Sequence, residues 1–267
     1  MKKFFAFTFA LFFTVGMAFG QSNDATVTQD GGSNQAYIDQ TYSGSGSANT
    51  ATVDQSGDQN EVGQAAGDGL FQTGAGNSFD VVQSGDENIL RGENPFEQDG
   101  EGNTALVNQF GDENRIYDLD QFGDENEAFV DQGTANNNAN GNFVDANEQR
   151  GNRNLIDIDQ RTGNNRVGTL PNNSPLGIIQ DGNDNSLTIE QKGSTGNAVG
   201  AFGGQTAVSQ LGSDNSANVL QDGFSNTVER ILQDGSMNVV DIDQMSSNNV
   251  AQTTQIGTSN TATITQQ

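Results

Sequence analysis

The sequence contains no cysteine, no histidine and no tryptophan, and only three prolines in 267 residues. Without cysteine the chain can form no disulfide and offers no thiolate nucleophile. Without histidine it lacks the usual proton shuttle and a common metal ligand of enzymes. Because these groups carry much of enzyme chemistry, we expect a protein that is not an enzyme, binds no cofactor and has no catalytic or metal-binding residues.

Positive charge is also scarce, because 10 Lys and Arg stand against 35 Asp and Glu, and the formal net charge is −25. A nucleic-acid-binding surface needs basic side chains that neutralise phosphates, so we expect no nucleic-acid partner. A low apolar content together with 34 glycines would by itself indicate a disordered chain. The regular order in which the residues recur indicates a folded one.

The only long apolar run lies at the N-terminus, where two lysines precede residues 4–13. Ala18 and Gly20 provide the small residues of a cleavage site before Gln21. This pattern is typical of a secretory signal peptide, so we predict that residues 1–20 are a signal peptide and that the protein is secreted. The run is shorter than the ~20 residues that span a bilayer, and we expect no membrane insertion.

The rest of the chain repeats one short unit, Gln-x-Gly-x-x-Asn-x-Φ-x-Φ-x-Gln, in which Φ is apolar and the two glutamines are about eleven residues apart. About twenty-one copies, degenerate ones included, run from Asn23 to Gln266. A short fixed period indicates one elongated repeat domain, which we assign to residues 21–267. The clean copies are Gln29–Gln40, Gln72–Gln83, Gln98–Gln109, Gln121–Gln132, Gln149–Gln160, Gln180–Gln191, Gln210–Gln221, Gln233–Gln244 and Gln255–Gln266.

Between Asn and Gln, apolar and polar residues alternate with a period of two. In NLIDIDQ, Ile156 and Ile158 share one face; in NTATITQ, Ala262 and Ile264 do the same. Such alternation indicates a half-buried β-strand. Two strands and two arcs make a coil of about 22 residues, and stacked coils form two facing parallel sheets. The predicted fold is an all-β β-solenoid of about ten coils built from 11-residue half-repeats.

Asparagine and glutamine open and close the inward face of each strand, so stacked coils should align like amides into ladders. Each amide would donate to one neighbouring coil and accept from the other. Because a buried amide without partners costs about 1–3 kcal/mol, such ladders would fix the register of the coils. The predicted ladder residues are Asn23, Gln29, Asn34, Gln40, Asn103, Gln109, Asn126, Gln132, Asn154, Gln160, Asn185, Gln191, Asn215, Gln221, Asn238, Gln244, Asn260 and Gln266.

The arcs between strands are rich in Gly, Asp and Asn, which tolerate the conformations that a chain reversal needs. Acidic GDEN arcs begin at residues 85, 111 and 123, and we expect Asp86 and Asp112 to stack on one edge. Such a column could hold Ca²⁺, but a solvated charged edge is favoured because a calcium-binding Gly-Gly-x-Gly-x-Asp pattern is missing. Arg150 and Arg153 would offset part of the charge of Asp124 and neighbouring acids. The predicted turn glycines are Gly31, Gly57, Gly85, Gly100, Gly111, Gly123, Gly151, Gly182, Gly212, Gly223, Gly235 and Gly257.

The repeat is irregular in a few places. Loop insertions are expected near residues 41–48, 64–72, 133–141 and 168–177, the last of which carries two of the three prolines. The spacing to Gln121 and to Gln233 stretches to twelve residues, which predicts a single-residue β-bulge in each unit.

The pattern Gln-x-Gly-x-x-Asn-x-Ala-x-x-x-Gln resembles the curlin repeat of curli, the functional amyloid of bacterial surfaces. Gln255, Gly257, Asn260, Ala262 and Gln266 fit that pattern position for position. The resemblance implies a secreted subunit that folds as a β-solenoid, adds end to end to a growing fibre and forms biofilm matrix at the bacterial cell surface. It also implies three kinds of partner, namely further copies of the chain, a nucleator, and secretion or chaperone proteins.

The chain ends on a complete unit, QIGTSNTATITQQ. We therefore expect open strand edges at both ends of the solenoid and head-to-tail polymerisation through them. The alternatives are a monomeric solenoid adhesin, an ice-binding protein with outward rows such as Thr261, Thr263 and Thr265, and a minor fibre nucleator. The regular, uncharged last repeat favours a major subunit. A glycosidase-like carboxylate pair is disfavoured, because the acidic residues recur with the repeat and face solvent.

Overall fold

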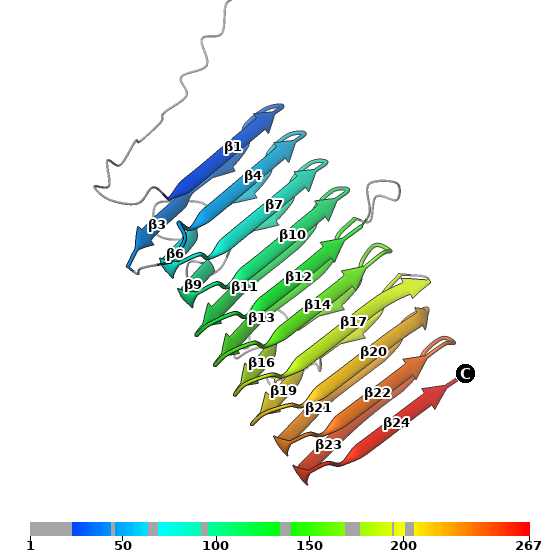
Figure 1. Ribbon diagram of the computed structural model, residues 1–267. Coiled ribbons are helices and arrows are strands. Elements are labelled where there is room, and N and C mark those ends of the chain that lie inside the picture. Colours follow the sequence, from blue (N-terminus) through cyan, green and yellow to red (C-terminus); the bar gives the residue numbers. More distant parts are fainter. Residues whose placement is uncertain are drawn as a thin grey trace, which may run out of the picture.

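The computed structural model describes residues 23–43, 46–63, 69–91, 96–133, 140–168, 177–193, 195–200 and 206–267. The predicted signal peptide, residues 1–20, lies outside them. The secondary structure of the described residues consists of β-strands, which pair in parallel into two sheets. No helix in this part of the chain could cross a membrane. Figure 1 shows the strands stacked into an elongated body, with β1 at one end and β24 at the other.

The first sheet contains ten parallel strands in chain order, so each strand pairs with its counterpart one coil away. These strands are β1 (Asp24–Asp30), β4 (Thr50–Ser56), β7 (Ser78–Ser84), β10 (Thr104–Phe110), β12 (Glu127–Gln132), β14 (Leu155–Gln160), β17 (Ser186–Gly193), β20 (Ser216–Gly223), β22 (Val239–Gln244) and β24 (Thr261–Gln266).

The second sheet contains the alternate segments of the chain, and five of its coils carry a strand that is divided into two pieces. The divided strands are β2 (Gln35–Ala36) with β3 (Ile38–Tyr42), β5 (Glu61–Val62) with β6 (Leu70–Ala75), β8 (Ile89–Leu90) with β9 (Phe96–Glu101), β15 (Arg166–Val167) with β16 (Ile178–Asp181), and β18 (Ala198–Val199) with β19 (Val208–Leu211). The continuous ones are β11 (Arg115–Phe122), β13 (Phe143–Arg150), β21 (Thr227–Ser236) and β23 (Val250–Thr258).

The predicted all-β solenoid is confirmed, but its size differs slightly from the expectation. In the described residues ten strands of the first sheet alternate with nine levels of the second, which gives nineteen half-repeats. The expected twenty-one copies and ten coils are therefore slightly too many. Eight of the ten strands in the first sheet have a neighbour on both sides.

Apolar side chains from the inward faces of both sheets fill the space between them. Phe79 and Phe96 meet edge to face from opposite sheets, with ring centroids 6.4 Å apart. Burial of such side chains contributes about 25 cal/mol per Å² of apolar surface. One fully buried column runs along the first sheet and consists of Val53, Val81, Val107, Val130, Ile158, Ile189, Val219 and Ile242.

The irregular positions lie in the second sheet. In β11, Asp118 has a φ of 55° and is left out of the pairing with β13, and the register of β21 against β23 shifts between Val228 and Arg230. The bulge expected near Gln233 is thus confirmed, whereas near Gln121 the extra residue is unpaired without a shift of register against β13. Most of each insertion expected near 64–72, 133–141 and 168–177 lies outside the described residues, whereas of the one near 41–48 only residues 44 and 45 do. The insertion near 64–72 ends earlier than expected, because residues 70–72 pair with β3 as part of β6.

One buried side chain in the second sheet breaks the apolar pattern. Asn147 in β13 pairs with Leu119 on one side and with Ile178 on the other, at an inward position. It is 1% exposed, and neither its Oδ1 nor its Nδ2 has a hydrogen-bond partner within the described residues. Its position escapes prediction from the repeat because the segment from Asn142 to Gln149 is one residue longer than the unit.

Replacing Asn147 by leucine should raise the free energy of unfolding by about 1–3 kcal/mol, because the change removes an unpaired buried amide. Urea denaturation of the monomeric protein, followed by circular dichroism, measures the effect. Asn154→Leu is the matched control, since the Asn154 amide is hydrogen-bonded and its loss should lower stability. The explanation is wrong if both variants shift the urea midpoint downward.

Candidate functional site

Two continuous glutamine ladders run the length of the solenoid, one along each sheet. In each ladder the side-chain Nε2 of a glutamine donates to Oε1 of the glutamine one coil further along the chain, at 2.6–3.1 Å. All these bonds point the same way, so the ladders have a direction. The first-sheet ladder consists of Gln29, Gln55, Gln83, Gln109, Gln132, Gln160, Gln191, Gln221, Gln244 and Gln266. The second-sheet ladder consists of Gln40, Gln72, Gln98, Gln121, Gln149, Gln180, Gln210, Gln233 and Gln255.

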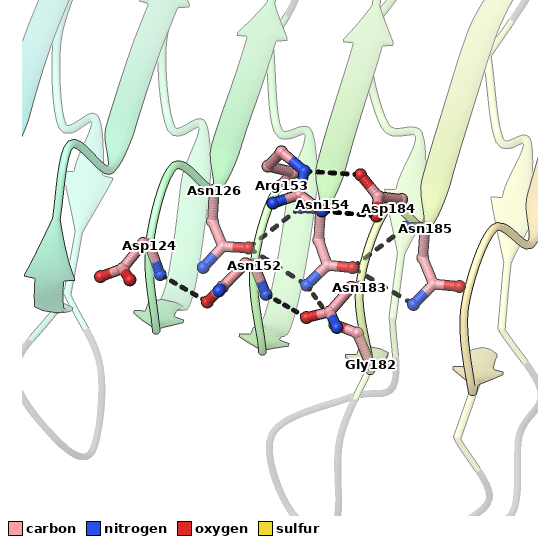
Figure 2. Close-up of polar contacts among 9 residues, drawn as sticks. All are labelled: Asp124, Asn126, Asn152, Arg153, Asn154, Gly182, Asn183, Asp184 and Asn185. Atoms are coloured by element: carbon pink, nitrogen blue, oxygen red, sulfur yellow. Dashed lines mark hydrogen bonds and ion pairs between the residues drawn. The ribbon is translucent and has the colours of Figure 1, made fainter.

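Two asparagine columns follow the edges of the solenoid, but they use the backbone as well as the side chain. Asn126 Oδ1 accepts from the backbone N–H of Asn154 at 3.0 Å, and Asn154 Oδ1 accepts from that of Asn185 at 3.1 Å. Asn154 Nδ2 donates to the carbonyl oxygen of Gly182 at 2.9 Å (Figure 2). Because each side chain binds the residue that precedes a strand and the carbonyl oxygen of an arc glycine, these columns hold the arcs and not only the strands.

The structure places the predicted ladder residues in these columns. Twelve of the eighteen are no more than 1% exposed, and they are Asn103, Gln109, Asn126, Gln132, Asn154, Gln160, Asn185, Gln191, Asn215, Gln221, Asn238 and Gln244. The other six, Asn23, Gln29, Asn34, Gln40, Asn260 and Gln266, lie at the two ends and are partly or fully exposed. The prediction omitted most of the second-sheet ladder, although the same repeat pattern contains it.

The arc glycines stack directly over one another. All twelve predicted turn glycines have a positive φ, between 100° and 157°. A Cβ on Gly151 would lie 2.1 Å from the carbonyl oxygen of Gly182 in the next coil, so only glycine fits this backbone contact. Gly74 belongs to the same stack, with a φ of 114°, and was missed because its arc reads GAGN.

The residues that follow these glycines form a further column of hydrogen bonds. Asp86 Oδ1 accepts from the backbone N–H of Asp58 at 2.8 Å, and Asp112 Oδ1 accepts from that of Asp86 at 3.0 Å. The expected stacking of Asp86 and Asp112 on one edge is confirmed. No group of three acidic residues in the described part of the chain is placed to hold a metal ion.

The two arginines expected to offset the acidic arcs behave differently. Arg153 forms a two-bond ion pair with Asp184 in the next coil, with both N–O distances 2.8 Å (Figure 2). The guanidinium lowers the pKa of the Asp184 carboxyl. Arg150 instead pairs with Glu148 on its own strand. The Arg153–Asp184 ion pair lies on the edge formed by the arcs at Gly123, Gly151 and Gly182. The GDEN arcs at 85 and 111 lie on the other edge.

Comparison with protein families identifies the repeat. Three separate segments, residues 20–48, 151–193 and 212–244, match the curlin associated repeat. The chain therefore carries the curlin associated repeat. The matched segments cover about two fifths of the chain, and the same ladder contacts continue through the residues between them. A comparison with curated proteins gave no match. The curlin repeat is a structural repeat, and its presence supports a curli-like subunit in general terms.

The solenoid has strands with an unpaired outer edge at each end of its described part. Every residue of β1 is exposed, and Val27 is 43% exposed although its counterparts Val53 and Val81 are fully buried. At the other end β23 and β24 carry the exposed strand edges (Figure 1). An exposed edge presents unpaired backbone N–H and C=O groups to another chain. These ends are the candidate functional site of the curlin-repeat solenoid.

A row of acidic side chains crosses the outer face of the second sheet of the curlin repeats. Asp120 lies beside Glu148 of the next coil in the pairing of β11 with β13. Its side chain accepts a hydrogen bond from the backbone N–H of Glu97 at 3.1 Å. Burial, together with the negative charges of Asp118, Glu148 and Glu97, raises the pKa of Asp120 to about 7. The ionised Asp120 is therefore a source of instability at neutral pH.

Because the pKa of Asp120 is higher in the folded than in the unfolded state, its penalty is full above pH 7 and disappears as the pH falls towards 4. Asp120→Asn should therefore stabilise the protein at pH 8 by about 2–4 kcal/mol, and much less at pH 4. Urea denaturation at both pH values measures this. Asp80→Asn, on the exposed face of the first sheet, is the control. An equal gain for Asp120→Asn at both pH values would contradict the assignment.

Proposed function

We propose that this chain is the secreted structural subunit of a curli-like amyloid fibre, which grows by end-to-end addition and serves biofilm matrix formation and surface adhesion. The curlin repeat supports a curli-like subunit. The main support for fibre formation is the exposure of the strand edges at both ends. There, side chains such as Val27 occupy positions that are buried in the inner coils. A second copy on each end would bury these edges.

The uniform direction of the glutamine ladders supports head-to-tail rather than head-to-head addition. Among the described residues no donor reaches Oε1 of Gln29 or Gln40, so one end offers acceptors. At the other end, Gln255 and Gln266 use Nε2 only for backbone carbonyls and have no further glutamine to donate to. Identical ends brought together would place donors against donors or acceptors against acceptors. Open association of unlike ends produces filaments.

The negative charge explains how such a subunit stays soluble before it assembles. The whole chain has a formal charge of −25, which becomes −27 without Lys2 and Lys3 of the predicted signal peptide. The repulsion between copies is therefore strong at low ionic strength and is screened over about 10 Å at 0.1 M salt. Fibre growth should accordingly accelerate with added NaCl. A growth rate that does not respond to salt would remove this part of the proposal.

Seeded growth of the purified chain 21–267 tests the fibre. We expect a lag that fibre seeds abolish, thioflavin binding, and filaments in electron micrographs. Val27→Lys places a charge on the inward face of the exposed β1 and should block growth while the monomer remains folded. Thr26→Lys, on the outward face of the same strand, is the matched control and should still polymerise. Monomers that persist in the parent protein, or a Val27→Lys variant that grows normally, would contradict the proposal.

A further inference from the structure

Successive half-repeats make the same contact along the whole solenoid. Each glutamine donates from Nε2 to the carbonyl oxygen of the residue that follows the asparagine of the preceding half-repeat. Gln40 donates to Asp24, Gln55 to Gln35, and the series continues without interruption to Gln266, which donates to Val250. Half-repeats in the two sheets are therefore equivalent. A half-turn about the long axis, with a rise of about 2.4 Å, carries each onto the next.

Because of this symmetry, the arrangement of two docked copies depends on whether each copy has an odd or an even number of half-repeats. The described solenoid holds nineteen, with ten glutamines in the first ladder and nine in the second. If a second copy stacked without rotation, β1 would pair with β24 and the first sheet would continue. The second sheet would then lack one strand between β23 and the incoming β2–β3, which would leave buried backbone groups and amides unpaired.

A half-turn of the second copy removes this gap. The incoming β1 then takes the vacant level of the second sheet on β23, and the incoming β2–β3 takes the next level of the first sheet on β24. Strand directions remain parallel, because the half-turn exchanges the two sheets. Both sheets continue at every level with the spacing that they have inside one copy.

The sequences at the two ends match in this arrangement. On β23, NDATVTQ (residues 23–29) aligns with NVAQTTQ (residues 249–255), so that Ala25 lies on Ala251. On β24, NQAYIDQ (residues 34–40) aligns with NTATITQ (residues 260–266), so that Ile38 lies on Ile264. The asparagines and glutamines coincide at both ends of both pairs. The apolar contacts of the core would therefore continue across the junction.

The hydrogen-bonding groups match as well. Gln255 and Gln266 at one end need acceptors, and Oε1 of Gln29 and of Gln40 at the other end supply them. Within the described part of the chain, Gln29 Nε2 lacks the backbone acceptor that all later ladder glutamines have. In the rotated arrangement the carbonyl oxygen of Thr261 of the preceding copy would occupy the corresponding place. Every type of contact between half-repeats is thus available at the junction.

We infer that successive copies dock with a half-turn about the fibre axis, β1 on β23 and β2–β3 on β24, so that the two sheets exchange at each junction. This inference rests on the proposed fibre and specifies its interface. Each copy would advance the fibre by nineteen half-steps, about 46 Å, in addition to the twist that the sheets themselves accumulate.

Disulfide trapping tests the junction, because the natural chain contains no cysteine. Thr28 and Thr254 precede Gln29 and Gln255 and are exposed on the outward faces of their strands, so the half-turn brings them side by side. Neighbouring strands lie about 4.8 Å apart, within the Cα–Cα range of a disulfide. Thr28→Cys with Thr254→Cys should therefore give covalent multimers when preformed fibres are oxidised. Thr28→Cys with Thr265→Cys is the matched control, since only unrotated docking on β24 joins those positions.

The outcomes separate the junction from the fibre. Multimers on a non-reducing gel from the 28/254 variant, with few from the 28/265 variant, support the half-turn. Fibres in which the 28/265 pair joins, in which both pairs join equally, or in which neither joins overturn it while the fibre stands. Protein that stays monomeric in electron micrographs and sedimentation overturns the proposed fibre and the junction together.

Discussion

Gly100→Ala is expected to lower the free energy of unfolding by about 3 kcal/mol or more, because the substituted arc cannot pack on the next coil. A Cβ at this position would lie 2.0 Å from the carbonyl oxygen and 2.7 Å from the carbonyl carbon of Gly123. The φ of 137° is also one that residues with a Cβ rarely adopt. Both atoms that would have to move belong to the backbone of the neighbouring arc, so the strain would spread to the coil above. Urea denaturation of the monomer measures the loss.

Gly102→Ala, two residues later in the same arc, is the matched control. Gly102 has a φ of 69°, and the atom nearest to a Cβ at this position would be Cγ of Glu125, at 3.7 Å. Alanine can take this left-handed conformation at a cost of about 1 kcal/mol. If the two variants lose equal stability, the cost lies in the backbone conformation of the arc and the stacking argument is wrong.

The repeat made most of the fold predictable, because the residue pattern of each half-repeat indicates which side chains face inward and where the chain turns. The alternation in NLIDIDQ placed Ile156 and Ile158 inside, and both are fully buried. The glycines of inner QxGxxN arcs, such as Gly123 and Gly151, mark positions where the backbone of the next coil passes within contact distance. Stacking repeats each local contact in every coil, because each residue lies beside a residue of the same type in the next coil. For this reason a pattern that is weak in one copy becomes specific over nineteen.

The features that escaped prediction depend on contacts that one unit does not contain. The asparagine columns bond to backbone groups one coil away, which could not be separated from an amide-to-amide ladder by spacing alone. Asn147 was hidden because an extra residue before Gln149 shifts the alternation. The pairing of Arg153 with Asp184 required knowing which arcs share an edge across the insertion near residues 168–177. Register over long sequence separations therefore had to come from the structure.

Gln149→Glu is expected to have an effect of similar size, because it changes one atom in the middle of a buried ladder. Gln149 Nε2 donates to Oε1 of Gln180 at 3.1 Å and to the carbonyl oxygen of Glu127 at 3.0 Å, and the residue is 1% exposed. A carboxylate oxygen in place of Nε2 would face two acceptors and would carry a buried charge. Breaking such a buried network costs about 3–5 kcal/mol. We therefore expect the variant to be unfolded or strongly destabilised at pH 7.

Acidification should recover much of the stability lost in Gln149→Glu, because a protonated carboxyl can donate one of the two missing bonds. Burial raises the folded-state pKa of such a glutamate, so its penalty is full above that pKa and falls away as the pH drops towards 4. The matched control is Gln59→Glu, which adds the same charge at an exposed arc position that is occupied by Glu87 and Glu113 in the following coils. It should change stability by no more than about 0.5 kcal/mol. Urea midpoints at pH 4 and pH 7 for both variants decide the matter, and a pH-independent loss in Gln149→Glu would mean that shape, and not the donated hydrogen bonds, holds the ladder together.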